Sequence, residues 1–558
     1  MRSTDEARQV EEERAPAHPP DRRATRRWWP AALTALVAGL PPLLLFGSVL
    51  VGGGPKAVSD DIALLVLGAR DALHGGVLLG PYSRYGWHHP GPSYFYLLAV
   101  PTWLWHNSPT GIYVVVPLIA AVCAAGTALL VRRGAGAAPG WVAAGAVALF
   151  VAGVGGATVR DPWNPYVVAL PVLLSVVAGG LGAAGVPGAL PWAAVAGTFA
   201  VQTHVSTAPV VGGVLAVAVV ARVVRRLRRG PGPVPWWRPA TWVATALLVA
   251  AWAPPLWDEA FGTGNLDAMW RFFTAPHPTH AWGDAWRTVA AVFEATLFQH
   301  HAAVQEGVAP RNAAAVTAVF VALAVSAVVV GAVRRRPVAV WLGVAALLAG
   351  ALAVESVTRV VGPLFRYLVV WMAVLPAVPI VAVAAALAPS HRTAGSDGRA
   401  PRRDGRGPPR HRATSSRAGA APVGVALVVV AVLVPLGLAL RAVARTPPAV
   451  DLTDHDIQAA YRLVAPAVGP PGSAVRIEIT DGGRWPAAAG VGLELVRHGH
   501  PIRVQPPWTL LFGDRRRATG REPAAIIVAG VDPRTWPAAA RARLLGRAGP
   551  EYLFVRRP

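Results

Sequence analysis

Ser59, Asp60 and Asp61 directly follow the first long apolar segment of the chain. A carboxylate in this place can act as the general base that removes a proton from an attacking hydroxyl group. The same residues suit a helix start, with Ser59 as the N-cap and two acids in the first turn, where the helix dipole favours negative charge. The two interpretations are compatible. Asp60 and Asp61 are therefore candidate catalytic residues, with Asp60 slightly preferred as the base.

The stretch "GPYSRYGWHHPGPSYFYLL", residues 80–98, gathers aromatic and hydrogen-bonding side chains in an otherwise apolar chain. A cation among aromatic rings suits a lipid phosphate and a sugar ring together. The alternative is an aromatic patch at a membrane interface. Adjacent histidines point in different directions on most backbones, so the pair is a poor metal signature. The candidate substrate-binding residues are Tyr82, Arg84, Trp87, His88 and His89.

A second polar motif, "RDPWNP", interrupts two apolar segments at residues 160–165. Asp161 is a third candidate catalytic residue, and Arg160 and Asn164 are candidate substrate-binding residues. Asp161 and Asn164 carry the oxygen ligands that a hard divalent cation prefers, and with one of the first two acids they would form a shared site. A divalent cation is therefore a candidate cofactor. In the alternative interpretation the prolines only end helices.

The composition indicates a polytopic membrane protein. Of 558 residues, 54% are hydrophobic and 15% are charged, and apolar runs of about twenty residues recur; this length matches a bilayer. The net charge of +23 comes from arginines beside apolar runs, which indicates cytoplasmic loops rather than a nucleic-acid partner. A single cysteine, Cys123, excludes an intramolecular disulfide. We predict eleven spans, at 30–51, 110–131, 140–157, 164–185, 188–206, 207–224, 238–256, 311–333, 338–357, 362–388 and 422–442.

The arginine-rich loops orient these spans, because cytoplasmic loops carry the excess of positive charge. We predict a disordered cytoplasmic tail at 1–28 and a transmembrane domain at 29–442. The long extracytoplasmic loops are then 52–109 and 257–310. Within the first loop, residues 91–106 are too short to span and suit a helix lying in the outer interface. The basic segments on the cytoplasmic side are Arg132 and Arg133, 225–229, 334–336 and the linker 391–417.

This orientation places polar side chains of later spans on the outer side. Gln202 and His204 lie close to a span end and are costly to bury unpaired, so they line a cavity or face the headgroups. Arg359 and Arg366 oppose the usual charge bias. Phosphate binding would explain them, and the alternative is that they snorkel to the interface.

Residues 445–558 return to a soluble composition and predict a small extracytoplasmic α/β domain. No P-loop and no GxGxxG between a strand and a helix is present, so nucleotide binding has no support. The pattern predicts helices at 456–467, 486–498 and 537–546, and strands in "AVRIEIT", "IRVQ", "AIIVAG" and "EYLFVRR".

The layout resembles the GT-C superfamily of membrane glycosyltransferases, which includes protein O-mannosyltransferases and lipid A aminoarabinose transferases. "SDDIALL" stands where the family has its catalytic acidic motif, "HHPGPSYFYLL" resembles the Pro-containing segment of its interfacial helix, and "RDPWNP" stands at its second-loop acidic motif. The second motif has one Asp instead of DxD. The C-terminal domain lacks WWDYG, which argues against transfer of a whole glycan to asparagine.

The resemblance implies an α-helical, multi-pass protein of a bacterial-type cell membrane. It implies Asp60 or Asp61 as base, a role for Asp161, and a polyprenyl-phosphate sugar as donor. The sugar would pass, with inversion, to a glycan, lipid or protein acceptor on the extracytoplasmic face. The donor phosphate would meet Arg359 or Arg366, and the aromatic stretch would cover the sugar.

Two other classes of function stay open on the sequence. A lipid or glycan transporter would explain the spans, but we find no paired inverted repeat and no ionisable residue deep within a span. A non-catalytic cell-envelope assembly protein would tolerate loss of Asp60 and Asp61. Substitution of the two acids distinguishes this class from an enzyme, and uptake by vesicles would identify a transporter.

Overall fold

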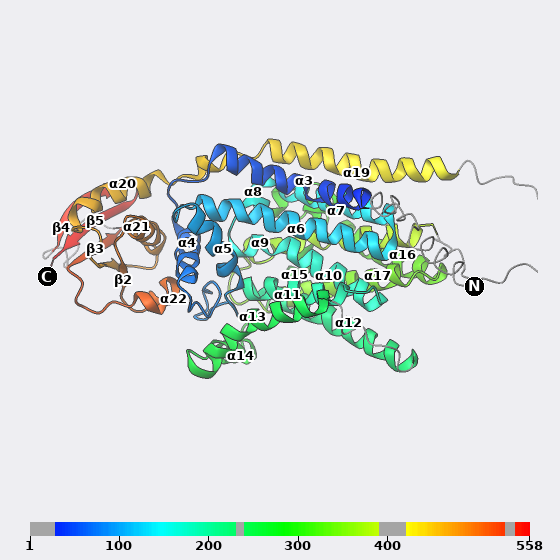
Figure 1. Cartoon of the computed structure of the whole chain (residues 1–558), viewed down its shortest axis with the longest axis horizontal. Helices are drawn as coiled ribbons and strands as arrows, with labels where there is room; N and C mark the ends of the chain where they lie inside the picture. Colours follow the sequence, from blue (N-terminus) through cyan, green and yellow to red (C-terminus); the bar gives the residue numbers. More distant parts are fainter. Residues whose placement is uncertain (1–27, 230–238, 390–419, 531–541, 558) are drawn as a thin grey trace, which may run out of the picture.

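The computed structural model describes residues 28–229, 239–389, 420–530 and 542–557, and it is mostly helical (Figure 1). A long helical bundle carries a smaller domain with a β-sheet at one end. The predicted tail 1–28, apart from Trp28, and the predicted linker 391–417 lie outside the described residues. The α-helices of the first half are α3 (Trp29–Gly52), α4 (Asp60–Leu73), α5 (Ser93–Leu104), α6 (Thr110–Ala135), α7 (Ala137–Val154), α8 (Gly156–Arg160), α9 (Asn164–Val167), α10 (Ala169–Ala184), α11 (Ala189–Thr203), α12 (Ala208–Arg229) and α13 (Pro239–Phe261).

The second half of the bundle continues with short 3₁₀ turns between longer helices. Its elements are α14 (Asn265–Thr274), α15 (Trp282–Leu297), η2 (His301–Val304), α16 (Ala313–Val333), α17 (Pro337–Thr358), η3 (Arg366–Leu368), η4 (Val370–Val374), α18 (Ala377–Leu387) and α19 (Ala420–Ala444). A further 3₁₀ turn, η1 (Val205–Thr207), joins α11 to α12.

Nine of the described helical segments are long and apolar enough to cross a membrane. This confirms a multi-pass helical protein, but the predicted number of eleven spans is not confirmed. The two predicted spans outside this set correspond to α11, which has only 15 residues, and to α13, which is interrupted by Pro254 and Pro255.

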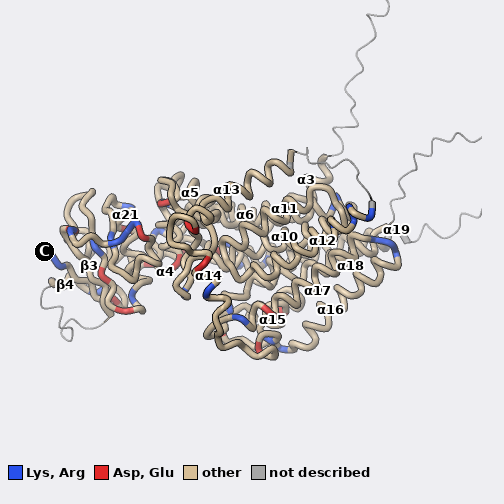
Figure 2. The backbone as a smooth tube through the Cα atoms, turned by 90° about the horizontal axis from the view of Figure 1, so that it is seen from below, with Lys and Arg blue, Asp and Glu red and all other residues tan. Residues whose placement is uncertain are grey.

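Charged residues gather at the two ends of the bundle. Figure 2 shows basic residues without acidic ones at the end that carries the start of α19, and both signs around α4, α14, α15 and the C-terminal domain. The middle of the bundle is almost free of charge. Its centre is α10, which packs against α6, α11, α12 and α17 and is nearly all buried. A long uncharged middle of this kind is what a bilayer requires.

The C-terminal domain is a five-stranded mixed sheet in the order β2-β1-β3-β5-β4. β1 is parallel to β2 and to β3, whereas β5 is antiparallel to β3 and β4. All four predicted strands are present, because their alternating or continuous apolar residues are buried. The elements are η5 (Ala449–Leu452), α20 (His455–Val464), η6 (Ala465–Ala467), β1 (Val475–Ile479), α21 (Trp485–Arg497), β2 (Ile502–Val504), α22 (Thr509–Phe512), η7 (Asp514–Arg516), β3 (Ala524–Ala529), β4 (Arg543–Ala548) and β5 (Glu551–Arg556).

One predicted element of this domain is wrong in part. The sequence predicted a helix at 537–546, but residues 543–548 form the strand β4, which pairs with β5. The remainder of that prediction, 537–541, falls outside the described residues. Pairing with β5 along one edge of the sheet outweighs the weak local helical pattern.

Helix α4 lies between the bundle and the C-terminal domain (Figure 1). It packs on α5 closely because Gly68 has no side chain, and a Cβ there would lie 2.3 Å from the Phe95 ring. On its other side it contacts α21. The Ser59 hydroxyl makes no capping bond to its own helix but donates to Asp454, the N-cap of α20, at 2.7 Å. The helix that begins with the two candidate acids is thus attached to both parts of the molecule.

Candidate active site

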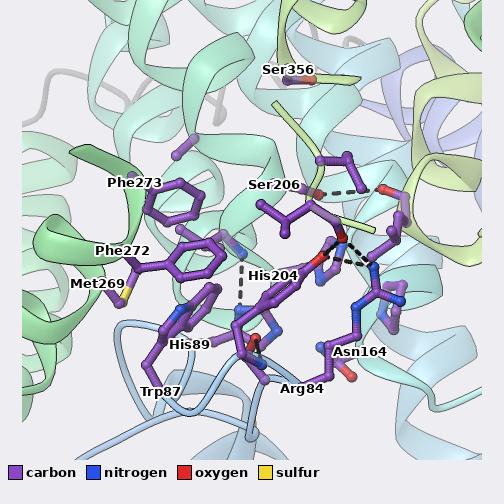
Figure 3. A pocket seen from close by; sticks show the side chains of 18 of the residues that line it. Arg84, Trp87, His89, Asn164, His204, Ser206, Met269, Phe272, Phe273 and Ser356 are labelled. Atoms are coloured by element: carbon purple, nitrogen blue, oxygen red, sulfur yellow. Dashed lines mark hydrogen bonds between the residues drawn. The ribbon is translucent and has the colours of Figure 1, made fainter. Parts of the chain in front are cut away.

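A cavity of about 490 Å³ lies between the first outer loop, the "RDPWNP" motif, α14 and the segment after α17 (Figure 3). Of the sequence candidates, it is lined by Asp61, Tyr82, Arg84, Trp87, His89, Asn164, His204 and Arg359. Residues from segments nearly 300 positions apart in sequence therefore surround one space. Most of its surface is apolar or aromatic, with a few convergent polar groups, as is usual for a ligand site.

Asp61 is the acid that faces this cavity. The side chains of Tyr82 and Trp163 hydrogen-bond to its carboxylate. Burial, together with the charges of Asp60 and Asp161, raises the pKa of Asp61 to about 6 against the opposing effect of the two hydrogen bonds. A carboxylate with this pKa is ionised at neutral pH and more basic than an exposed one, which suits a general base.

Asp60 does not line the cavity. Its backbone has a φ of 54°, in the left-handed region that non-glycine residues seldom adopt, and its side chain is exposed. Partial burial of the carboxyl group and the nearby charge of Asp454 raise its pKa. Asp61, the next residue, lines the cavity instead.

The structure brings the "RDPWNP" motif close to Asp61. Asp161 accepts a hydrogen bond from the Trp163 backbone N–H at 2.8 Å, and its charge acts on Asp61 although it does not line the cavity. Burial raises the pKa of Asp161 to about 6, against the effect of Arg160. Trp163 connects the two acids, because its backbone N–H donates to Asp161 and its side chain hydrogen-bonds to Asp61.

Contacts with three other segments fix this motif. Arg160 is buried and donates to the carbonyl of Pro447 at 2.7 Å, so it holds the start of the C-terminal domain and does not reach the cavity. The Tyr94 hydroxyl donates to the carbonyl of Pro162 at 2.5 Å. Asn164 lines the cavity, and its amide donates to the Thr203 carbonyl at 3.1 Å.

The other three candidate arginines have different surroundings. Arg84 lines the cavity, donates to the Val361 carbonyl at 3.0 Å and lies over the Phe365 ring at 5.1 Å. Arg359 also lines the cavity, is largely exposed, and pairs with Glu355 at 2.7 Å. Arg366 lies elsewhere, and its guanidinium donates to backbone carbonyls of the second outer loop.

The candidate histidines and Gln202 also differ in whether they line the cavity. His89 and His204 are buried at the cavity with their rings 5.1 Å apart. His88 faces away and contacts the Leu510 carbonyl of the C-terminal domain through Nε2 at 2.9 Å. Gln202 is fully buried behind the wall, donates to the Ala251 carbonyl at 2.8 Å and packs on Gly91, where no larger residue fits.

An aromatic wall from the second outer loop was not among the sequence candidates. Met269, Phe272 and Phe273 of α14 lie together on the side of the cavity near Trp87 (Figure 3), with Trp87 and Phe272 centroids 5.6 Å apart. Asn265 holds α14 in place, since it exchanges two hydrogen bonds with the backbone of His88. The run "MWRFF", residues 269–273, is the sequence signal that could have identified this wall.

A second cavity, of about 250 Å³, meets Asp61 from the side of the C-terminal domain. It shares Asp61, Tyr82 and Asn164 with the first cavity and runs along α4 to Asp71 and Arg516. The candidate base is therefore accessible from two directions.

No group of three or more His, Cys, Asp or Glu side chains is placed to hold a metal ion within the described ranges. Asp161 and Asn164 lie near Asp61, the one of the two first acids that lines the cavity.

The fold is similar to that of ArnT from Cupriavidus metallidurans. Its structure bound to undecaprenyl phosphate matches with a TM-score of 0.56 and 15% identity, covering 94% of this chain and 98% of that one. The structure of the same protein in the apo state matches with a TM-score of 0.56, 16% identity and the same coverage. A scan against family models finds no match, and a search of curated proteins finds no relative. The structural likeness confirms the predicted fold class at the level of the fold: a helical membrane protein, similar in fold to ArnT, with a small C-terminal α/β domain.

Proposed function

We propose that this protein is a membrane glycosyltransferase that moves a sugar from a polyprenyl-phosphate donor to an acceptor hydroxyl on the extracytoplasmic face, with Asp61 as general base. The observation that carries the proposal is the position of Asp61, a carboxylate with a raised pKa at the meeting point of two cavities. The fold shared with a protein whose structure holds undecaprenyl phosphate supports the lipid-linked donor.

The first cavity suits the donor. Its aromatic wall provides flat surfaces for a sugar ring, and Arg84 and Arg359 provide positive charge for a phosphate. The exposed apolar side chains of α13 and α14, such as Trp257 and Trp270, suit contact with lipid, where the donor's tail would stay.

The second cavity suits the acceptor, because α4 and residues 511–516 of the C-terminal domain contribute to its lining. In the reaction the acceptor oxygen attacks the anomeric carbon while the bond from that carbon to the phosphate oxygen breaks. Asp61 takes the hydroxyl proton, and the phosphate leaves with the bonding electrons and two negative charges near Arg84. Configuration at the anomeric carbon inverts.

The decisive experiment compares Asp61→Asn with Asp60→Asn in transfer from a polyprenyl-phosphate sugar. Loss of a general base lowers turnover by about 100-fold or more. We expect this loss in Asp61→Asn, with binding of polyprenyl phosphate retained, and a loss of less than about tenfold in Asp60→Asn. Full activity of Asp61→Asn, or equal losses in both variants, would refute the assignment.

A further inference from the structure

A third cavity, of about 250 Å³, lies between α4 and the C-terminal domain and has a basic lining. The carboxylate of Asp71 is its one acidic lining group, and Arg516 donates to both carboxylate oxygens, at 2.5 and 2.7 Å. Arg70, Arg503 and Arg515 also line the cavity. Three guanidinium groups therefore stay unneutralised around one space.

The backbone contacts of these arginines leave their charge available. Arg70 donates to the Val496 carbonyl at 3.1 Å and Arg503 to the Arg515 carbonyl at 2.7 Å. Neither they nor Arg515 form an ion pair with a carboxylate in the part of the chain that the structure describes. Burial, and to a lesser extent the nearby charge of Arg516, lower the pKa of Arg70 against the opposing charge of Asp71.

A buried histidine adds a polar ring to this lining. His500 lines the same cavity and is only 5% exposed. Its Nδ1 is buried without a hydrogen-bond partner among the described residues. An unsatisfied buried polar atom is costly, so the ring is held at some cost beside the arginines.

The basic cavity is continuous with the proposed acceptor route. Asp71, Arg515 and Arg516 line both the second and the third cavities. Helix α4 runs along this route from Asp61 to Arg70, a rise of roughly 14 Å at 1.5 Å per residue. A bound oligosaccharide can therefore place a hydroxyl at Asp61 and another group at the arginines.

We propose that the third cavity binds a carboxylate or phosphate group of the acceptor, so that the acceptor is an anionic glycan. This inference rests on the proposed function and defines the acceptor class. Charge-assisted hydrogen bonds to Arg503 and Arg515 hold the anionic group and set the register of the glycan relative to the base. A neutral glycan would leave the three guanidinium groups without an anionic partner.

The test uses the full chain in phosphatidylcholine nanodiscs and two probes of equal length, trigalacturonate and maltotriose. We expect the wild-type protein to bind trigalacturonate at least tenfold more tightly, because each charge-assisted contact is worth about tenfold or more. In Arg503→Gln/Arg515→Gln the preference should disappear. If the double variant unfolds, the single variant Arg515→Gln, at an exposed position, replaces it. Its affinity for trigalacturonate should fall about tenfold.

Arg521→Gln is the matched control, since Arg521 is an exposed arginine of the same domain outside the cavity, and it should keep the preference. Equal binding of the two probes by the wild type would overturn the inference. A preference that survives in both cavity variants would overturn it as well. Asp61→Asn should lose transfer and keep the preference, so failure of this inference and failure of the proposed enzyme give different results.

A lipid headgroup is the competing source of the anion. Vesicles of phosphatidylglycerol and of phosphatidylcholine distinguish it from a glycan. If only phosphatidylglycerol binding falls in Arg503→Gln/Arg515→Gln, the cavity holds a lipid and the acceptor assignment is wrong. Unchanged vesicle binding together with the lost trigalacturonate preference supports the anionic glycan.

Discussion

Asp71 and Arg516 form a bidentate ion pair that joins α4 to the C-terminal domain, with Arg516 mostly buried. Arg70, one residue earlier, donates to the Val496 carbonyl at the end of α21. At the other end of α4, Ser59 donates to Asp454. The helix that carries Asp61 is therefore held along its length by the C-terminal domain, which makes that domain part of the support of the candidate base.

Removing the buried partner of this pair should destabilise the protein. In Arg516→Ala the Asp71 carboxylate would stay partly buried without its partner, and loss of one partner of a buried pair costs about 3–5 kcal/mol. Since Asp71 keeps some exposure, we expect a loss in the free energy of unfolding near the lower end, about 3 kcal/mol. Chemical unfolding in detergent measures this loss. Arg517→Ala removes an exposed pair with Asp514 and should cost less than about 1 kcal/mol. If both variants lost the same free energy of unfolding, the ion pair between Asp71 and Arg516 would have no special structural role.

Transfer activity should depend on pH through Asp61. The folded protein holds the pKa of this acid at about 6, so the active carboxylate form is lost as pH falls through 6 and is fully present above about 7. The kcat/KM profile should rise with pH through this region and then level off. Asp60→Asn removes one charge that raises the pKa and should move the midpoint to lower pH. A profile without a midpoint between pH 4 and 7 would exclude Asp61 as the base.

Ionisation of Asp61 should lower the stability of the folded state, although it is needed for activity. Because the folded pKa of Asp61 lies above its unfolded value, the folded state penalises ionisation, and this cost is present above pH 6 and relieved below it. Asp61→Asn should thus raise Tm at pH 7.5 relative to wild type and change it less at pH 4. Thermal unfolding of both proteins at the two pH values measures this difference.

The cavity arginines should control donor binding. A charge-assisted contact is worth roughly 1.5–3 kcal/mol, so Arg84→Ala should weaken binding of polyprenyl phosphate by about tenfold or more. Lys at the same position should rescue only in part, because it lacks the planar fork that reaches the carbonyl and the phosphate together. Arg271→Gln, an exposed arginine of α14 that pairs with Asp267, should leave affinity unchanged. Unchanged affinity in Arg84→Ala would remove the phosphate role.

The orientation in the membrane is testable because Cys123 is the only cysteine and is buried. A cysteine introduced at the exposed Arg521 should react with an impermeant thiol reagent in intact cells. One introduced at the exposed Arg335, in the turn between α16 and α17, should react only after the membrane is opened. The reverse pattern would invert the predicted topology.

The sequence predicted the elements of this protein better than the contacts of its site. Long uncharged runs and the strands of the C-terminal domain follow from local hydrophobic patterns, which is why most spans and all four strands were found. The choice between Asp60 and Asp61 depends on which of two neighbours lines the cavity, and this is fixed by segments distant in sequence. The separate roles of Arg359 and Arg366 depend on which carbonyls lie nearby, and the α14 wall depends on a long loop folding back over the first one. Such contacts between distant segments leave no local pattern.

Asp61 belongs to the walls of two cavities that reach it from different sides. If the donor uses one and the acceptor the other, both substrates must be present together before the sugar moves. Initial rates should then give intersecting lines in double-reciprocal plots, without the parallel lines of a covalent sugar–enzyme intermediate. The spent lipid phosphate, which leaves by the bundle side, should compete with the donor and not with the acceptor.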